Sequence, residues 1–386
     1  NKVLNTIIDS LKEVVPYDAA VIFLINEKTC EIEQEVSRGY NPDFIQKLHL
    51  KVGQGLSGWV AKTGQPILVP DVRKDKRYVV ADPQTLSEIA VPLMRGKKII
   101  GVFNVESKKV NAYTWQDVEL LKTFASQATI TIENARLFKE ALHKRYLEKE
   151  LEVAREIQKA LLPKRLPKVK RFAFAALNVP SEQVGGDFYD AIKLADGTVS
   201  LAIADVSGKG TPGAILMSNL SATFRSQVRR DLPPDVILER VNKLFCETIT
   251  SGSFATFFYG KLNPRTKSFE YANAGHNPPL LIRSDGSMEF LKKGGLIMGF
   301  LPRVEYNREE VQLAPGDLLI MYTDGLTEAE NKKGQLFGTE RLIKVVKKHT
   351  KLPPTVVKRK IFQELKKFLK GSPLSDDVTL LLVKAV

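Results

Sequence analysis

Hydrophobic and polar positions follow two different periods along this 386-residue chain. Apolar residues spaced three or four apart predict amphipathic helices, whereas alternation and short apolar runs predict strands. Residues 1–134 open with a helical pattern at 3–15 and close with another that starts near residue 114. Between them, the pattern predicts a short helix after a glycine-rich turn at 53–58, and strands at 19–25, 31–37, 67–70, 89–93 and 99–105.

The closing helix has a clear start and an apolar stripe. Thr114 is a suitable N-cap, and Asp117 places a negative charge in the first turn, where the helix dipole favours it. The stripe consists of Leu121, Phe124, Ala128, Ile132 and Ala135. We therefore expect this helix to pack along a sheet and to complete the first domain.

Residues 135–163 read as a helical linker that Pro163 ends. Apolar residues recur every three or four positions, at Leu147, Leu151, Ala154, Ile157 and Leu161. Charged residues of both signs flank this seam, as they do in a coiled coil. Two interpretations remain open: a short coiled coil that makes a homodimer, or a surface helix packed on one domain.

Residues 164–386 alternate strands with pairs of helices. The predicted strands are 172–179, 187–194, 199–206, 255–262, 269–274, 279–282, 317–322 and 377–383. The predicted helices are 212–228, 234–248, 340–349 and 354–370. This order favours an α+β domain in which two packed sheets are covered by helices.

Composition narrows the function classes. The chain is 43% hydrophobic and 26% charged, as in ordinary globular domains. No apolar run approaches the ~20 residues of a membrane-spanning helix. The net charge of +14 comes largely from lysines on predicted surface helices without interleaved aromatic residues, so we expect a solvated face and no nucleic-acid partner. Only two cysteines, Cys30 and Cys246, favour a reducing, cytoplasmic setting. Because the chain begins with Asn1, we expect it to be part of a longer protein.

Acidic residues follow or begin several apolar strands of residues 164–386. They are Asp187, Asp205, Asp324, Asp376 and Asp377, each beside Gly or other small residues. A carboxylate at such a place is costly unless a cation balances it, and oxygen ligands suit Mg²⁺ or Mn²⁺. One such motif alone is typical of a turn, and we interpret Asp190 and Asp196 in that way. The joint pattern predicts a metal site.

Residues 1–134 resemble a GAF domain over nearly their full length. The resemblance rests on the segment 53–64 with Pro66-Ile67, on Val69-Pro70-Asp71, on Ala90-Val91-Pro92-Leu93, and on residues 124–135. It implies an antiparallel sheet with flanking helices and an unknown small-molecule or protein signal. The glycines at 53–58 are not a phosphate-binding loop, since no Gly-Lys-Ser/Thr follows them.

Residues 151–386 resemble SpoIIE-type phosphatases of the metal-dependent PPM (type 2C) family. The resemblance is carried by four acidic motifs, which contain Asp187, Asp205, Asp324 and the pair Asp376-Asp377. It is also carried by Ala154-Arg155-Glu156-Ile157-Gln158 and Asn273-Ala274-Gly275-His276-Asn277-Pro278-Pro279. The resemblance implies an αββα sandwich that hydrolyses phosphoserine or phosphothreonine. The implied substrate is an anti-anti-sigma (STAS) regulatory protein.

The same resemblance implies two Mn²⁺ or Mg²⁺ ions and a role for each acidic residue. Asp205 bridges both ions, the Val206 carbonyl and Asp187 serve one of them, and Asp324 and Asp376 hold the other. Asp377 orients a ligand or a water molecule. The resemblance therefore implies that Asp205 and Asp187 are the catalytic residues.

Three points stay open from the sequence. The Arg that grips phosphate in the wider type 2C family has no identifiable counterpart, and Lys209 is either its substitute or part of a Gly-Lys-Gly turn. His276 is either an acid for the leaving group or a structural turn residue. The alternative to an enzyme is a signal-binding scaffold with vestigial catalysis.

Overall fold

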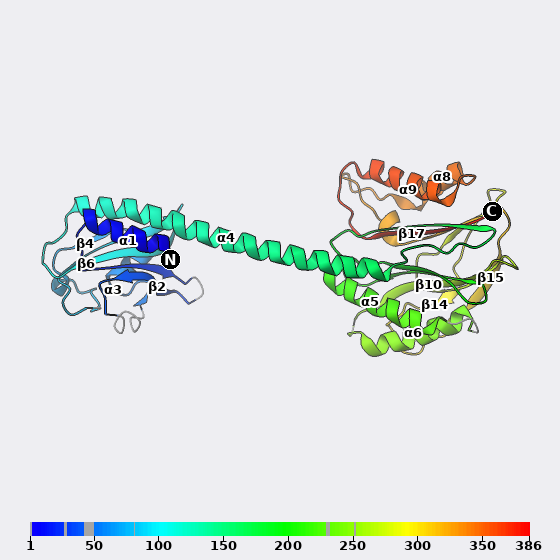
Figure 1. Cartoon of the computed structure of the whole chain (residues 1–386), viewed down its shortest axis with the longest axis horizontal. Helices are drawn as coiled ribbons and strands as arrows, with labels where there is room; N and C mark the ends of the chain where they lie inside the picture. The colour runs from blue at the N-terminus through cyan, green and yellow to red at the C-terminus, as the bar shows by residue number, and fades with distance from the viewer. Residues whose placement is uncertain (1, 27–28, 42–49, 81, 229–231, 251) are drawn as a thin grey trace. The chain divides into compact units, whose positions relative to one another are not determined.

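The computed structural model describes residues 2–26, 29–41, 50–80, 82–228, 232–250 and 252–386. The chain divides into two compact units, Asn1–Tyr146 and Leu147–Val386 (Figure 1). One helix, α4 (Trp115–Leu161), contributes its first part to one unit and its last part to the other. No helix in the described ranges is both long enough and apolar enough to cross a membrane.

The first unit is built on a six-stranded antiparallel sheet of order β3-β2-β1-β6-β5-β4. Its strands are β1 (Ala19–Ile25), β2 (Glu31–Arg38), β3 (Leu50–Lys51), β4 (Ile67–Val69), β5 (Ser87–Arg95) and β6 (Lys98–Ser107). Its other elements are α1 (Lys2–Val14), α3 (Gly55–Thr63), the 3-10 turn η1 (Val72–Lys74) and the start of α4. The antiparallel sheet with flanking helices confirms the predicted fold of this unit.

Helices cover both faces of this sheet because its strands alternate apolar side chains between two cores. On one face, α1 and α4 pack against Ile22 and Phe103, and on the other, α3 packs against Val21 and Phe23. The start of α4 is capped at Thr114 as predicted, since Thr114 Oγ1 accepts the Asp117 backbone N–H at 3.5 Å. The Thr114 hydroxyl and backbone N–H both donate to Asp117 Oδ2, each at 2.7 Å.

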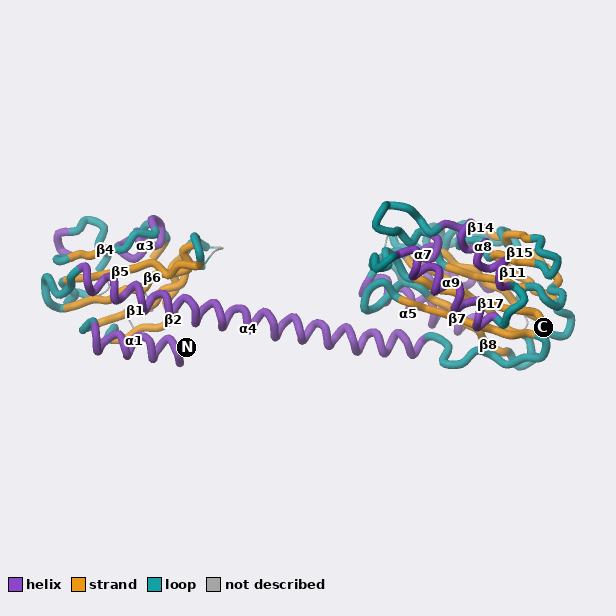
Figure 2. The backbone as a smooth tube through the Cα atoms, turned by 90° about the horizontal axis from the view of Figure 1, so that it is seen from above, coloured by secondary structure: helices purple, strands orange, loops and turns teal. Residues whose placement is uncertain are grey.

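The second unit contains two largely antiparallel sheets that lie face to face (Figure 1). Figure 2 distinguishes its strands, helices and loops by colour. The first has the order β14-β11-β10-β9-β8, with β15 also paired to β11, and the second has the order β13-β12-β16-β17-β7. The first sheet comprises β8 (Phe188–Lys193), β9 (Val199–Val206), β10 (Ala255–Asn263), β11 (Ser268–Ala274), β14 (Gly294–Gly295) and β15 (Arg308–Gln312). The second comprises β7 (Phe172–Val179), β12 (Leu280–Ile282), β13 (Met288–Phe290), β16 (Leu318–Tyr322) and β17 (Val378–Ala385). Within the first sheet, β11 and β14 pair in parallel.

Helices cover the outer face of each sheet and make four layers. The pair α5 (Gly210–Gln227) and α6 (Pro234–Thr248) packs on the first sheet through Phe224 and Phe245. The pair α8 (Gly338–His349) and α9 (Pro354–Leu369) packs on the second sheet through Leu342 and Ile361. A short helix, α7 (Asp324–Thr327), follows β16. The predicted αββα sandwich is therefore confirmed.

Candidate active site

The acidic motifs meet because four strand ends meet. In the first sheet, Phe188 at the start of β8 pairs with Ala204 near the end of β9. In the second sheet, Tyr322 at the end of β16 pairs with Leu380 near the start of β17. Both pairs of ends lie at the same end of the sandwich, because Thr323, just beyond β16, is hydrogen-bonded to Asp187, just before β8. The sequence could place each carboxylate at a strand end, but only the sheet pairing brings those ends together.

A hydrogen bond joins the two sheets at this end. The Thr323 hydroxyl, beyond β16, donates to Asp187 Oδ2, just before β8, at 2.7 Å. Both side chains are buried. Thr323 Oγ1 also accepts the Thr379 backbone N–H at 3.0 Å, which fixes the hydroxyl orientation. The strand ends that carry Asp187, Asp324 and Asp377 are therefore held in one place.

Asp377 acts as an anchor for the loop before Asp187. Its Oδ2 accepts the Gly186 N–H at 2.6 Å, and its Oδ1 accepts the Ser181 N–H at 2.7 Å and the Ser181 hydroxyl at 3.0 Å. A side chain at Gly185 cannot fit, since its Cβ would lie 2.0 Å from Asp377 Oδ2. Gly185 therefore leaves the space that the Asp377 carboxylate occupies.

The electrostatics of the cluster are dominated by uncompensated negative charge. Burial, with the nearby Asp324 and Asp376 carboxylates, raises the pKa of Asp205 to about 7. Burial and the Asp205 charge hold the pKa of Asp187 well above its ordinary value. Burial likewise raises the pKa of Asp324, with Glu328 and Asp376 adding to the effect. These groups repel one another in the absence of a cation.

Asp376 differs from the others because it already has a cationic partner. Lys209 Nζ lies 3.0 Å from Asp376 Oδ2 and donates to the Ser375 carbonyl at 2.7 Å. Lys209 precedes α5 as its N-cap residue and is about half exposed. The Gly-Lys-Gly segment therefore does turn the chain into a helix, and its ammonium group also reaches the acidic cluster.

Comparison with known proteins supports this arrangement. Residues 195–386 match the family model of stage II sporulation protein E (SpoIIE), and residues 1–133 match a GAF domain model. The phosphoserine phosphatase RsbU of Bacillus subtilis is 29% identical over 239 residues, which cover 62% of this chain and 70% of RsbU. Protein IcfG of Synechocystis is 30% identical over 261 residues, but this chain covers only 41% of its length. The solved SiaA-PP2C domain of Pseudomonas aeruginosa superposes with a TM-score of 0.58 at 24% identity, over 63% of this chain and 99% of that domain.

The chain joins a GAF domain to a SpoIIE-family phosphatase domain. The second domain is of the protein serine/threonine phosphatase type and has the PP2C fold. The SpoIIE match begins at residue 195, so Asp187 lies upstream of it. Its place beside the acidic cluster rests on the Thr323 hydrogen bond described above.

The residues of the SpoIIE domain fit a divalent cation by their chemistry. Phosphatases of this family generally depend on Mg²⁺ or Mn²⁺. The Asp187, Asp205 and Asp324 carboxylates supply hard oxygen atoms and excess negative charge. The Val206 carbonyl lies beside Gly186, whose added Cβ would sit 2.9 Å from that oxygen.

The side chains do not yet form a complete metal cage. Within the described ranges, no three Asp, Glu, His or Cys side chains are arranged to hold one ion together. The pairing of Asp376 with Lys209 is one physical reason, because that carboxylate is directed to an ammonium group. Cation binding would therefore have to exchange Lys209 for the metal at Asp376.

His276 is a structural residue of the SpoIIE domain. It is 4% exposed, and burial lowers the pKa of its imidazole to about 4, so the ring is neutral near neutral pH. Its Nδ1 pairs with the Thr256 hydroxyl at 2.7 Å, and its backbone N–H donates to Asn273 Oδ1 at 2.7 Å. Between the two sequence interpretations, this environment favours the turn residue over the acid for the leaving group.

Asp190 and Asp196, which the sequence placed in turns, have roles outside the acidic cluster. Asp190 is not in a turn: it lies within β8, is buried, and pairs with Arg225 Nε at 2.7 Å. Asp196 does lie in a turn, where its Oδ1 accepts the Thr198 N–H at 2.9 Å. Neither carboxylate is needed to explain the acidic cluster.

Sequence reasoning missed a contact between the linker helix and the loop before Asp187. Gln158 of α4 donates from Nε2 to the Gly185 carbonyl at 2.6 Å, and its Oε1 accepts the Gly185 N–H at 3.1 Å. The signal was present, since Gln158 belongs to the motif that carries the resemblance. Its partner is 27 positions away, and no pattern along the chain indicates which residue it meets.

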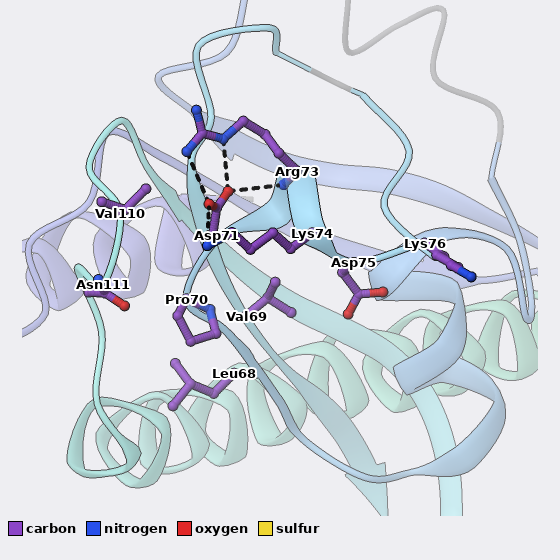
Figure 3. Close-up of a pocket in the computed structure, with 10 residues that line it drawn as sticks. All are labelled: Leu68, Val69, Pro70, Asp71, Arg73, Lys74, Asp75, Lys76, Val110 and Asn111. Carbon is purple, nitrogen blue, oxygen red and sulfur yellow. Dashed lines mark hydrogen bonds and ion pairs between the residues drawn. The ribbon is translucent and has the colours of Figure 1, made fainter.

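The GAF domain has a surface hollow of about 780 Å³ beside η1 (Figure 3). Its charged side chains largely satisfy one another. Arg73 donates to Asp71 from Nε and from its backbone, and this arginine lowers the pKa of Asp71 to about 2. Asp75, which also lines the hollow, pairs with Arg77 at 2.7 Å. The hollow therefore offers few charged groups to a ligand.

Proposed function

We propose that this protein is a metal-dependent phosphatase that removes phosphate from serine or threonine of a regulatory protein, under the control of its GAF domain. The observation that carries the proposal is the convergence of four acidic strand ends at one end of a SpoIIE-family sandwich. Relatives named phosphoserine phosphatase support the reaction class. The two unpaired cysteines fit a cytoplasmic protein.

The acidic residues divide the work in this proposal. Asp205 would contribute to holding both of two Mn²⁺ or Mg²⁺ ions, Asp187 and the Val206 carbonyl would hold one of them, and Asp324 and Asp376 would hold the other. When bound, such a pair of ions activates water for attack on phosphorus and neutralises charge on the phosphoryl oxygens. Asp377 acts from behind the site, by fixing the Ser181–Gly186 loop.

Lys209 also has a role in the proposed phosphatase reaction. If Asp376 held a cation instead of Lys209, the Lys209 ammonium would be free beside the acidic cluster. There it can contact a phosphoryl oxygen of the substrate, which would fill the role of the missing arginine. We propose a STAS-type regulatory protein as the substrate, by the resemblance of this domain to its family.

The experiment that tests this function is hydrolysis of a phosphoserine peptide by the full chain. We expect turnover with millimolar Mn²⁺, and its loss when a chelator is added. If the folded protein fails to hydrolyse the phosphoserine peptide both with Mn²⁺ and with chelator, the result would instead support a scaffold that regulates its partner by docking. A chromogenic phosphate ester assayed in parallel separates loss of chemistry from poor peptide recognition.

Control by the GAF domain is proposed to pass through α4, which runs unbroken from Trp115 to Leu161. Several large apolar side chains along it are exposed, namely Leu137, Phe138, Leu142, Tyr146, Leu147, Val153 and Ile157. Such a run favours a homodimer that covers it. Leu161, the last residue of the predicted seam, instead packs against the core under α5 and α6.

Insertions into α4 test this coupling. One residue inserted after Glu150 turns everything downstream by ~100°, whereas seven residues restore the face to within ~20°. We expect the single insertion to change basal activity or abolish any response to the signal, and the seven-residue insertion to preserve both. Activity and sedimentation are measured on each folded variant. Identical behaviour of the two would make the GAF domain independent of the phosphatase.

A further inference from the structure

Two buried glutamates face each other in the core of the GAF domain. Glu88 on β5 and Glu106 on β6 are directly opposite in the antiparallel register, and each is 3% exposed. Like charges at such a pair of positions repel each other and destabilise a sheet. Among the described residues, no ion pair to either carboxylate is found. A folded domain retains this arrangement only if protons or a cation balance it.

Each glutamate is held in position by neutral donors. Tyr40 donates its hydroxyl to Glu106 Oε1 at 2.6 Å, and Thr85 donates to Glu106 Oε2 at 2.5 Å. Asn104 donates from Nδ2 to Glu88 Oε1 at 2.5 Å and to Ser57 Oγ at 3.0 Å. These contacts orient the carboxylates without neutralising them. The geometry is that of a prepared acceptor site.

A cavity of about 20 Å³ lies between these groups. That volume holds one group the size of a water molecule. Glu88, Glu106 and Asn104 all line it, and Asn104 Oδ1 is buried without a hydrogen-bond partner. An amide oxygen left in this state costs free energy until a donor reaches it. The unpaired oxygen is evidence for a ligand that is independent of the two acids.

We infer that the GAF domain binds a small molecule through a protonated primary amine placed between Glu88, Glu106 and Asn104. An ammonium group has three N–H donors for these three acceptors. The remaining wall is aromatic and aliphatic, with Phe23, Tyr40, Tyr78, Leu50, Leu56 and Val79. Such a wall suits an amine with an apolar substituent better than a metal ion, which would require about six oxygen ligands. Val79, one of these lining residues, is 36% exposed, and the apolar substituent would lie on this side of the cavity.

This inference names the signal class for the control proposed above, but its test does not depend on phosphatase activity. Both tryptophans of the chain, Trp59 and Trp115, belong to the first unit. Trp59 lies in α3, two positions from Ser57, which lines the cavity. A Trp115→Phe variant leaves Trp59 as the single tryptophan, so its fluorescence reports on this domain within the full chain.

The experiment titrates that protein with methylammonium and n-butylammonium at constant ionic strength. We expect a saturable change in Trp59 fluorescence, and dissociation constants at least about 10-fold higher in Glu88→Gln and Glu106→Gln, because each loses a charged hydrogen bond. Glu13→Gln, a change at an exposed glutamate of α1, should leave binding unchanged. Circular dichroism checks that each variant is folded.

Three outcomes would overturn the inference. Tetramethylammonium, which has no N–H donor, could produce the same change as methylammonium. Both glutamine variants could bind the amines as the parent does. Mg²⁺, Mn²⁺ or Na⁺ could saturate the signal in a manner that Glu106→Gln abolishes, which would identify a metal site instead. Each of these results is distinct from a loss of phosphoserine hydrolysis.

Discussion

Replacing Asp205 with alanine should lower Mn²⁺-dependent turnover by at least about 100-fold, the largest effect of any single change in the site. In metalloenzymes, loss of a residue that only supports a ligand already costs 10–100-fold, and Asp205 is proposed to bridge both ions. Asp324→Ala and Asp376→Ala should each weaken one ion, which would appear as a higher Mn²⁺ concentration for half-maximal activity. Turnover is measured across a range of Mn²⁺ concentrations with a phosphoserine peptide.

The metal-free stability of this variant separates a site defect from a folding defect. Burial and neighbouring carboxylates raise the pKa of Asp205 to about 7, so its ionised form is unfavourable in the folded protein. Asp205→Ala should therefore unfold in chelator at a denaturant concentration no lower than that of the parent. Asp196→Asn, in a surface turn, is the matched control and should keep full activity. Near-parental turnover of Asp205→Ala at saturating Mn²⁺ would refute the assignment.

The second large effect is expected at Gln158, where Gln158→Ala should lower turnover by about 10-fold or more. Its amide makes two hydrogen bonds to Gly185, each worth about 1 kcal/mol, and they hold the loop that leads to Asp187. Without them, the loop and the Asp187 carboxylate gain freedom, so the Mn²⁺ requirement should also rise. Gln158→Glu, which keeps the acceptor but loses the donor, should also be impaired.

Lys159→Ala, a change at an exposed neighbouring position, controls for general effects on the helix. It should leave both turnover and the Mn²⁺ requirement unchanged. Because Gln158 is on α4, we propose this contact as a direct route from the linker helix to the acidic cluster. If Gln158→Ala and Lys159→Ala behave alike, the hydrogen bonds between Gln158 and Gly185 have no part in catalysis.

Local patterns were sufficient for the longer elements. The longer strands of the three sheets, the longer helices that cover them and the Thr114 cap all follow from residues within one turn or one strand of each other. Among the described residues, four short strands were missed, β3, β13, β14 and β15, and so were the short helical turns η1 and α7. Strands of two to five residues have too few positions for a period, and their pairing is supplied by neighbours elsewhere in the chain.

The sequence by itself determined which residues are candidates for the chemistry, because carboxylates beside small residues at strand ends are unusual enough in combination to be recognised. What only the tertiary structure decided is how those residues are used. The register of β5 and β6 sets Glu88 against Glu106, and the folded sandwich sets Asp377 under Gly186, 191 positions away. Lys209 likewise contacts Asp376 only once α5 is packed on its sheet. Contacts across such separations depend on the packing of whole layers, and packing of this kind leaves no period in the sequence.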